Sequence, residues 1–138
     1  MSSTPITIEA HIDADTQKVW DYWTKPEHIT KWNFASDDWH CPSAQNDLRV
    51  GGTYSARMEA KDGSFGFDFG AVYDEVKPLQ SLIYTMGDGR KAATRFEKTN
   101  TGTKVSTTFD AEQVNPVDMQ KAGWQAILNN FKKYIENN

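Results

Sequence analysis

The most informative stretch of the chain is PVDMQKAGWQAILNNFKKYI, residues 116–135. Its apolar side chains recur at the three- and four-residue spacing of one helical face. They are Val117, Trp124, Ile127, Leu128, Phe131, Tyr134 and Ile135. This spacing predicts one long amphipathic helix, with Asn115 as its N-cap and Pro116 in the first helical position.

Gly123 lies inside this predicted helix, where a glycine costs about 1 kcal/mol relative to alanine. A glycine in such a place indicates that another backbone or a ligand approaches the helix closely. Trp124 follows it directly. The Gly-Trp pair therefore predicts a helix that packs across the concave face of a curved sheet.

Upstream of the helix, the pattern begins with a strand and two short helices. Apolar and polar residues alternate over residues 5–12, which predicts a half-buried strand. Asp15 is placed to cap a first short helix, and Pro26 is placed to open a second one. Residues 40–48 predict an irregular edge strand.

Five further strands are expected between these helices and the long one. They cover residues 53–60, 64–76, 82–86, 92–98 and 103–110. Asp62-Gly63 predicts a two-residue hairpin turn, and a bulge near Gly70 would bring the apolar residues of its strand onto one face. The chain is therefore α+β, with a curved antiparallel sheet of about six or seven strands around a long C-terminal helix. The gap between sheet and helix is the candidate site.

Length, charge and composition limit the possible functions. The 138 residues suit one domain, residues 1–138. A net charge of −4 without a Lys and Arg cluster argues against nucleic acid and membrane as partners. No apolar run approaches the roughly 18 residues of a membrane span, and residues 1–5 lack a secretory pattern. We therefore expect a soluble, cytoplasmic protein.

Several short motifs form a recognisable set. They are Val19-Trp20, WTKPEHI at residues 23–29, Trp32, DLRVGGTY at residues 47–54, Asp62-Gly63, GAVYDEV at residues 70–76, Pro78-Leu79, Gly123-Trp124 and Leu128. Over nearly the whole chain, their order and spacing resemble the START-like, or SRPBCC, superfamily. Within it, the chain is most similar to single-domain, bacterial-type members of the activator of heat-shock protein 90 ATPase homologue (AHSA-type) family.

This resemblance implies the helix-grip, Bet v-like fold, in which a deep and mostly apolar cavity separates the sheet from the terminal helix. Superfamily members bind lipids, sterols, polyketides, hormones or flavonoids, and a few are cyclases or hydrolases. No catalytic motif shared by the family maps onto this chain. The resemblance implies no cofactor.

Aromatic residues, which make up 12% of the chain, supply the expected cavity wall. The side chains expected to line the cavity are Tyr54, Met58, Phe67, Phe69, Tyr84, Met86, Phe109, Trp124 and Leu128. The expected ligand is a small apolar or aromatic molecule that Tyr hydroxyl and Trp N–H groups hold in one orientation.

The sequence predicts no catalytic residue, metal site or nucleotide loop. His40 and Cys41 are neighbours in a strand, so their side chains point to opposite faces and cannot pair. The three histidines lie far apart in sequence, without the spacing of metal ligands. The glycines at Gly51-Gly52 and at residues 87–89 are not followed by the helix or lysine of a phosphate-binding loop.

An enzyme of the cyclase, dehydratase or hydrolase type is one alternative, with Asp68 or Tyr84 as proton donor. It requires Asp68 to face the cavity, where desolvation would raise the pKa of its carboxyl group. Strand alternation favours the opposite orientation, with Asp68 in solvent near Arg57 and Arg95. An arginine that turned inward would instead anchor a carboxylate-bearing ligand.

A partner-binding domain associated with a chaperone is the other alternative. It would show a contiguous exposed apolar patch around Trp23, Trp32 and Trp39. Burial of these tryptophans would count against it.

Overall fold

The computed structural model describes residues 4–138 and contains one seven-stranded antiparallel sheet, ordered β1-β7-β6-β5-β4-β3-β2. The strands are β1 (Pro5–Ile12), β2 (Trp39–Asn46), β3 (Thr53–Ala60), β4 (Gly66–Lys77), β5 (Ser81–Met86), β6 (Lys91–Thr99) and β7 (Gly102–Asp110). The helices are α1 (Thr16–Thr24), α2 (Pro26–Trp32) and α3 (Val117–Glu136). The predicted α+β fold is confirmed, with the irregular segment as the edge strand β2.

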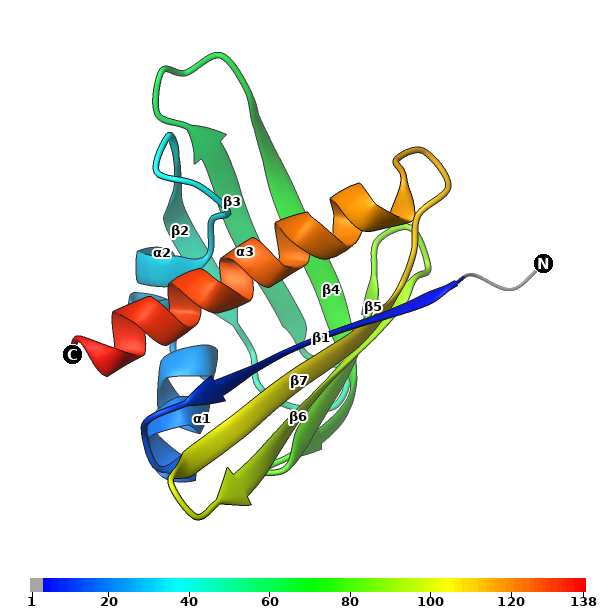
Figure 1. The fold of residues 1–138 in the computed structure, drawn as a ribbon. Helices are drawn as coiled ribbons and strands as arrows, with labels where there is room; N and C mark the ends of the chain where they lie inside the picture. The colour runs from blue at the N-terminus through cyan, green and yellow to red at the C-terminus, as the bar shows by residue number, and fades with distance from the viewer. Residues whose placement is uncertain (1–3) are drawn as a thin grey trace.

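The sheet curls around α3, which lies across its concave face (Figure 1). The short helices α1 and α2 lie near the C-terminal half of α3 (Figure 1). There the Phe131 ring of α3 packs with its centroid 5.0 Å from the rings of both Trp23 and Trp32. The C-terminal half of α3 therefore rests on a filled core, whereas its N-terminal half extends over the open part of the sheet.

The starts of the two short helices confirm the capping predictions. The Asp15 carboxylate accepts a hydrogen bond from the Lys18 backbone N–H at 2.8 Å, which satisfies one free amide of the first turn of α1. Pro26 occupies the first position of α2, where its missing N–H costs nothing. Among residues 4–138, no helix has the length and apolar character needed to cross a membrane.

The predicted N-cap of α3 is wrong by one residue. Pro116 has extended backbone angles and precedes the first helical residue, Val117, so it takes the cap position without a side-chain hydrogen bond. Asn115 instead donates its backbone N–H to the Glu112 carboxylate at 3.1 Å. The buried Gln120 side chain holds the preceding loop: its Oε1 accepts from the Glu112 N–H at 2.8 Å, and its Nε2 donates to the Asn115 carbonyl at 2.7 Å.

The connection between β3 and β4 is longer than the two residues predicted from Asp62-Gly63. It spans residues 61–65, because β3 ends at Ala60 and β4 begins at Gly66. Asp62 accepts from the Ser64 N–H at 2.8 Å, and Gly63 has a φ of 78°. The two residues do turn the chain, but they do so inside a longer loop that the bonded Asp62 side chain shapes.

The bulge in β4 lies at Asp74, between Tyr73 and Glu75, and not near Gly70 as predicted. Gly70 pairs regularly with Ser55 of β3. The inner face of β4 therefore continues through Ala71 and Tyr73, both buried. Val72 faces outward, so the next residue, Tyr73, directs its ring toward the concave side of the sheet.

Gly52 is expected to be essential for the turn before β3. A Cβ at this position would lie 2.0 Å from the Asp47 carbonyl oxygen. We expect Gly52→Ala to lower the free energy of unfolding by about 1–3 kcal/mol, the usual cost of overpacking. Gly70→Ala is the matched control, because its Cβ would meet nothing within 4 Å. Urea denaturation followed by tryptophan fluorescence measures both, and equal losses would contradict the assigned clash.

Candidate functional site

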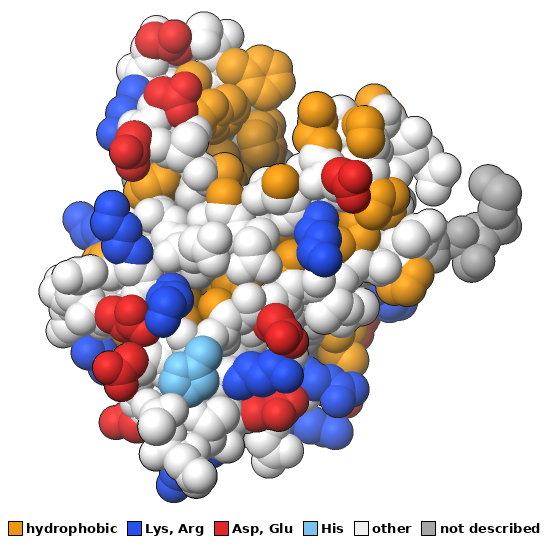
Figure 2. All heavy atoms as spheres, viewed as in Figure 1, with side chains coloured by type: hydrophobic (Ala, Val, Ile, Leu, Met, Phe, Trp, Pro, Cys, Tyr) orange, Lys and Arg blue, Asp and Glu red, His pale blue; other side chains and the backbone are white. Residues whose placement is uncertain are grey.

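A cavity of about 280 Å³ lies between the concave face of the sheet and the N-terminal half of α3. Figure 2 shows hydrophobic side chains within the hollow between the β3–β4 hairpin and α3. The cavity draws side chains from all three helices or their ends and from six of the seven strands. A site assembled in this way depends on the whole fold, because no single segment supplies it.

The sheet side of the cavity is an aromatic wall made by Tyr54, Phe69, Tyr73 and Tyr84. The rings of Tyr54 and Tyr84 are nearly parallel, with centroids 6.1 Å apart and an interplanar angle of 18°. Phe69 lies edge-on to Tyr84 at 6.0 Å, and Tyr73 does so at 6.1 Å. These offset contacts fix the rings without filling the space in front of them.

Trp124 forms the opposite wall, and its position is set by Phe109 of β7. The two rings stack at 3.9 Å with an interplanar angle of 10°. Phe109 itself is only 1% exposed. Phe109 therefore supports the wall from behind, while Trp124 faces the cavity together with Ile127 and Leu128.

Some polar groups of the cavity are already hydrogen-bonded to the protein. The Asn33 amide donates to the Tyr54 hydroxyl at 3.2 Å, and the Tyr73 hydroxyl donates to Asn46 Oδ1 at 2.8 Å. Thr94 and Thr107 bond to each other across β6 and β7 at 2.8 Å. The Tyr54 oxygen accepts a bond, so its own O–H remains available as a donor.

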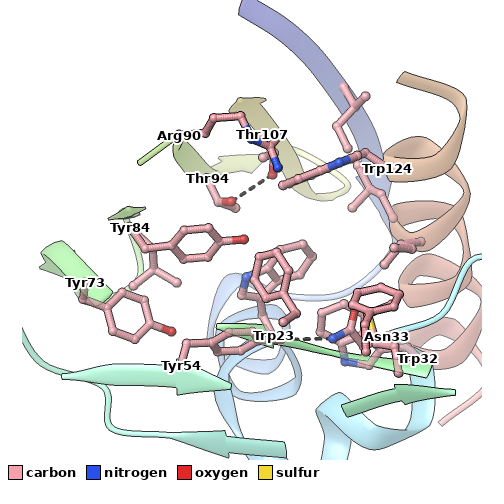
Figure 3. Close-up of a pocket in the computed structure, with 17 residues that line it drawn as sticks. Trp23, Trp32, Asn33, Tyr54, Tyr73, Tyr84, Arg90, Thr94, Thr107 and Trp124 are labelled. Carbon is pink, nitrogen blue, oxygen red and sulfur yellow. Dashed lines mark hydrogen bonds between the residues drawn. The ribbon is translucent and has the colours of Figure 1, made fainter. Parts of the chain in front are cut away.

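Two further donors have no protein partner among residues 4–138, namely the Tyr84 hydroxyl and the Trp124 indole N–H. No fully buried side-chain nitrogen or oxygen in that range lacks a partner. Both groups are therefore accessible, and both residues line the cavity. Figure 3 shows the Tyr84 hydroxyl directed into the space between the two walls.

Burial raises the pKa of Tyr54, Tyr73 and Tyr84 above the ordinary tyrosine value, because each phenolate would lose its hydration. For Tyr54, the neighbouring Tyr84 and Tyr73 raise the pKa further. All three hydroxyls are therefore neutral at physiological pH. The cavity presents them as hydrogen-bond donors and not as bases.

Arg90 places one positive charge at the edge of the cavity. Its Nε donates to the Asp88 carboxylate at 2.6 Å, and its Nη1 donates to the Asp110 carbonyl at 3.1 Å. Arg57 and Arg95 do not line the cavity, in agreement with the outward orientation expected from strand alternation. Arg90 lies in the turn between β5 and β6. Strand alternation does not apply in a turn, so the sequence does not predict the direction of the Arg90 side chain.

Seven of the nine residues expected to line the cavity do so, and two do not. The seven are Tyr54, Met58, Phe67, Phe69, Tyr84, Trp124 and Leu128. Met86 is 4% exposed and is enclosed by the core at the end of β5, and Phe109 lies behind Trp124. Alternation identifies the inner face of a strand, but it does not distinguish a side chain beside the space from one covered by protein.

Ten lining residues were not predicted: Ile8, Trp23, Trp32, Asn33, Tyr73, Leu82, Arg90, Thr94, Thr107 and Ile127. Leu82 and Thr107 could have been included, because they share strand faces with Tyr84 and Phe109. Tyr73 was missed because the bulge in β4 was misplaced. Trp23, Trp32 and Asn33 were missed because only the folded chain brings α1 and α2 to the sheet.

Asp68 lies on the outer face of β4, as strand alternation favoured. Its carboxylate is 3.5 Å from Arg57, which also bonds Glu59 at 2.9 Å. No Asp, Glu, His or Cys from residues 4–138 lines the cavity. Nor do these residues include a group of three or more such side chains that could hold a metal ion.

A model of the family described as activator of Hsp90 ATPase homolog 1-like protein (AHSA1) matches residues 13–136. The chain belongs to this family. The solution structure of an AHSA1-like protein from Aeromonas hydrophila shares 45% sequence identity with it. That match covers 97% of this chain and 93% of the other, with a TM-score of 0.92. The AHSA-type resemblance predicted from the motifs is thus confirmed.

Other solved structures share the AHSA1-like fold. A protein from Cytophaga hutchinsonii is 53% identical, with 96% of this chain and 92% of that chain covered and a TM-score of 0.83. A protein from Nitrosomonas europaea has the same TM-score of 0.83 at 18% identity, with 96% and 94% covered, and shows the fold alone. Comparison with curated proteins gave no match.

The raised tyrosine pKa values predict a loss of stability in alkali. A tyrosine in the unfolded chain ionises near pH 10, whereas the native state keeps Tyr54, Tyr73 and Tyr84 protonated at that pH. Their contribution is complete below about pH 10, and the free energy of unfolding falls as pH rises above it, because the unfolded state then binds fewer protons. Absorbance at 295 nm and circular dichroism should change together for these residues. Ionisation of all five tyrosines in a still folded protein would contradict this prediction.

Proposed function

We propose that this AHSA1-like protein binds a small aromatic or apolar molecule in the cavity under α3. The observation that carries the proposal is the cavity itself, walled by aromatic rings on both sides and supplied with accessible donors. Ligand pockets generally combine an apolar lining with a few placed polar groups that fix orientation. Tyr84 and Trp124, on facing walls, are placed to do this.

The available donors narrow the ligand class. The Tyr54 and Tyr84 hydroxyls, the Trp124 N–H and Arg90 all offer hydrogens to a bound molecule, and no carboxylate from residues 4–138 lines the cavity to accept one. A ligand with carbonyl, ether or phenolic oxygens on an aromatic frame, as in flavonoid-like and polyketide-like compounds, matches this set. Its volume must be modest, since about 280 Å³ lies near the lower end of ligand pockets.

The enzymatic alternative loses its best candidate, because Asp68 is exposed and pairs with Arg57. Tyr84 remains in the cavity, but its raised pKa makes it a weak acid that donates a hydrogen bond more readily than a proton. Binding is therefore the function that the geometry supports best.

Two substitutions are expected to weaken ligand binding while the fold remains intact. Tyr84→Phe removes one hydrogen bond and should reduce affinity by about threefold to tenfold. Trp124→Ala removes one wall and should reduce it by more than tenfold. Val72→Ala, on the outer face of β4, is the control and should leave affinity unchanged.

The measurement is a backbone amide NMR titration against flavonoids, aromatic polyketide-like compounds, fatty acids and sterols. Shifts should cluster around Tyr84, Trp124 and Leu128. A well-dispersed spectrum that no compound perturbs would contradict the proposal, as would equal affinity in folded Trp124→Ala protein.

A second candidate function rests on an exposed aromatic cluster made by Trp39, Phe65 and Phe67. The ring centroid of Trp39 lies 5.9 Å from that of Phe65 and 6.0 Å from that of Phe67. Phe65, at the β3–β4 hairpin, is 63% exposed. Of the three tryptophans expected in an exposed patch, Trp23 and Trp32 instead pack against Phe131, and Trp39 belongs to the aromatic cluster. The description of the family refers to an activator of the Hsp90 ATPase. This cluster is the surface through which such a partner would be bound.

Phe65→Ser tests this candidate with purified Hsp90. If the aromatic cluster binds the chaperone, the variant should weaken binding at least tenfold, as expected for an aromatic residue at the centre of an interface. Val50→Ser is the matched control, because Val50 is similarly exposed, at 66%, but lies in the β2–β3 connection. Calorimetry and Hsp90 ATPase rates report the result, and equal behaviour of the two variants would rule out the cluster.

A further inference from the structure

A second pocket of about 230 Å³, here called the annex, adjoins the cavity beside the N-terminal half of α3. The two spaces share Arg90 and Trp124 as lining residues. The annex is otherwise bounded by the loop before α3, through Glu112 and Asn115, and by Gly123 on α3. Arg90 and Trp124 therefore stand at the boundary between the two spaces, and a ligand long enough to pass Trp124 would reach the annex.

The annex is held in shape by hydrogen bonds within the protein. Gln120, 8% exposed, bonds the backbone of Glu112 and of Asn115, and this fixes the loop to the first turn of α3. Asn115 in turn donates its backbone and side-chain N–H groups to the Glu112 carboxylate. The polar groups of the annex are thus positioned before any ligand arrives, which lowers the entropic cost of binding.

Arg90 also lines the annex, and its guanidinium is fixed with donor capacity left over. Its Nε and Nη1 are bonded to Asp88 and to the Asp110 carbonyl, while Nη2 has no protein partner among residues 4–138. A guanidinium carries five N–H donors, so several remain for a ligand. The side chain lines both spaces, and it can contact a group at their junction.

The charges around the annex do not favour an anion. Arg90 is already paired with Asp88 at 2.6 Å, and the acidic residue Glu112 lines the same space. A carboxylate or phosphate bound here would be repelled by Glu112 and would compete with Asp88. Arginine donors that face carboxylate and amide acceptors suit uncharged groups that both donate and accept, which is the chemistry of hydroxyl groups.

Gly123 leaves the annex open on the helix side. A Cβ at Gly123 would meet nothing within 4 Å, so no protein backbone approaches this glycine. The close approach expected from the sequence is therefore not made by another part of residues 4–138. The space in front of Gly123 is available to a ligand, and a larger side chain at this position would occupy it.

We propose that the annex binds an uncharged, hydroxyl-rich group, such as a sugar, carried by the molecule whose aromatic or apolar body occupies the cavity. This rests on the proposed binding function and specifies the ligand class as a glycoside or a similarly hydroxylated conjugate. Arg90 donates to the hydroxyl oxygens, and Glu112 and the Asn115 side-chain oxygen accept from the hydroxyl hydrogens. Trp124, between the two spaces, contacts the junction of body and sugar.

The test compares matched ligands by NMR titration. Naringenin is measured against its 7-O-glucoside and 7-O-glucuronide, and 4-nitrophenol against its β-glucoside and β-glucuronide. We expect each glucoside to bind roughly fivefold to tenfold more tightly than its aglycone, through two or three added hydrogen bonds. Amide shifts should extend to Glu112, Gln120 and Gly123. The glucuronide, which adds one negative charge, should bind more weakly than the glucoside.

Variants at position 123 separate the annex from the cavity. Gly123→Leu fills the annex and should abolish the advantage of the glucoside while the aglycone affinity stays within about twofold. Gly123→Ala is the matched control, because its single methyl group leaves most of the space free and the glucoside should keep its advantage. Thermal melts of both variants establish that they fold.

The outcomes distinguish the two proposals. Aglycone binding with no gain from the sugar and no shift at Glu112, Gln120 or Gly123 would overturn the annex and leave the cavity function standing. Tighter binding of the glucuronide than of the glucoside would also overturn it, because the annex would then select an anion. Failure of every compound in both series to bind the wild-type protein would count against both proposals.

Discussion

The packing of Phe131 against Trp23 and Trp32 is the contact on which the site depends. It joins α3 to the α1–α2 end of the molecule, with ring centroids 5.0 Å apart in both pairs. Hydrogen bonds from Gln125 and Lys132 to the Glu9 and His11 carbonyls hold α3 along β1, and the curved sheet continues beneath the helix from there (Figure 1). The space that remains is bridged by Trp124, whose ring rests on Phe109. Removing either support would let the helix settle or tilt, and the cavity would change volume.

The cavity is polar only in a limited way. Its tyrosines stay neutral because burial raises the pKa of each hydroxyl, and their hydrogens are either shared with Asn46 or left for a ligand. Among residues 4–138, Arg90 is the one cationic side chain that lines the cavity, and Asp88 and the Asp110 carbonyl hold it at the edge. A buried unpaired charge would be costly, so this placement permits a charged donor near an apolar space. The arrangement selects for shape and for oxygen acceptors more than for charge.

Arg90 and Trp124 link two environments that differ in chemistry. On one side are aromatic rings and aliphatic side chains, and on the other are Glu112, Asn115 and the open face of Gly123. The β7–α3 loop forms this second environment, and the Gln120 side chain holds it in place through hydrogen bonds to the backbone of Glu112 and Asn115. Pro116 then takes the cap position of α3 without a side-chain hydrogen bond.

Much of the fold follows from local patterns in the sequence. The periodicity of residues 116–135, the N-cap Asp15, the first-position Pro26 and the alternation in β1, β3, β5 and β7 each act over a few residues, so they were sufficient to predict the elements. The same alternation placed Tyr54, Phe69 and Tyr84 on the inner face of the sheet. The helix lies across a concave face, as the Gly-Trp pair in α3 predicted, although no part of residues 4–138 approaches Gly123 closely.

Tertiary structure alone decided how these faces meet. The bulge at Asp74, the enclosure of Met86, the position of Phe109 behind Trp124 and the arrival of Trp23, Trp32 and Arg90 at the cavity all depend on contacts between distant segments. The period of a strand or a helix, two or 3.6 residues, determines on which face a side chain lies. Whether that face contacts protein or borders a cavity depends on the curvature of the sheet and the position of the helix. The sequence thus determined the elements and their apolar faces, and the packing of α3 on a curved sheet determined where a cavity remained.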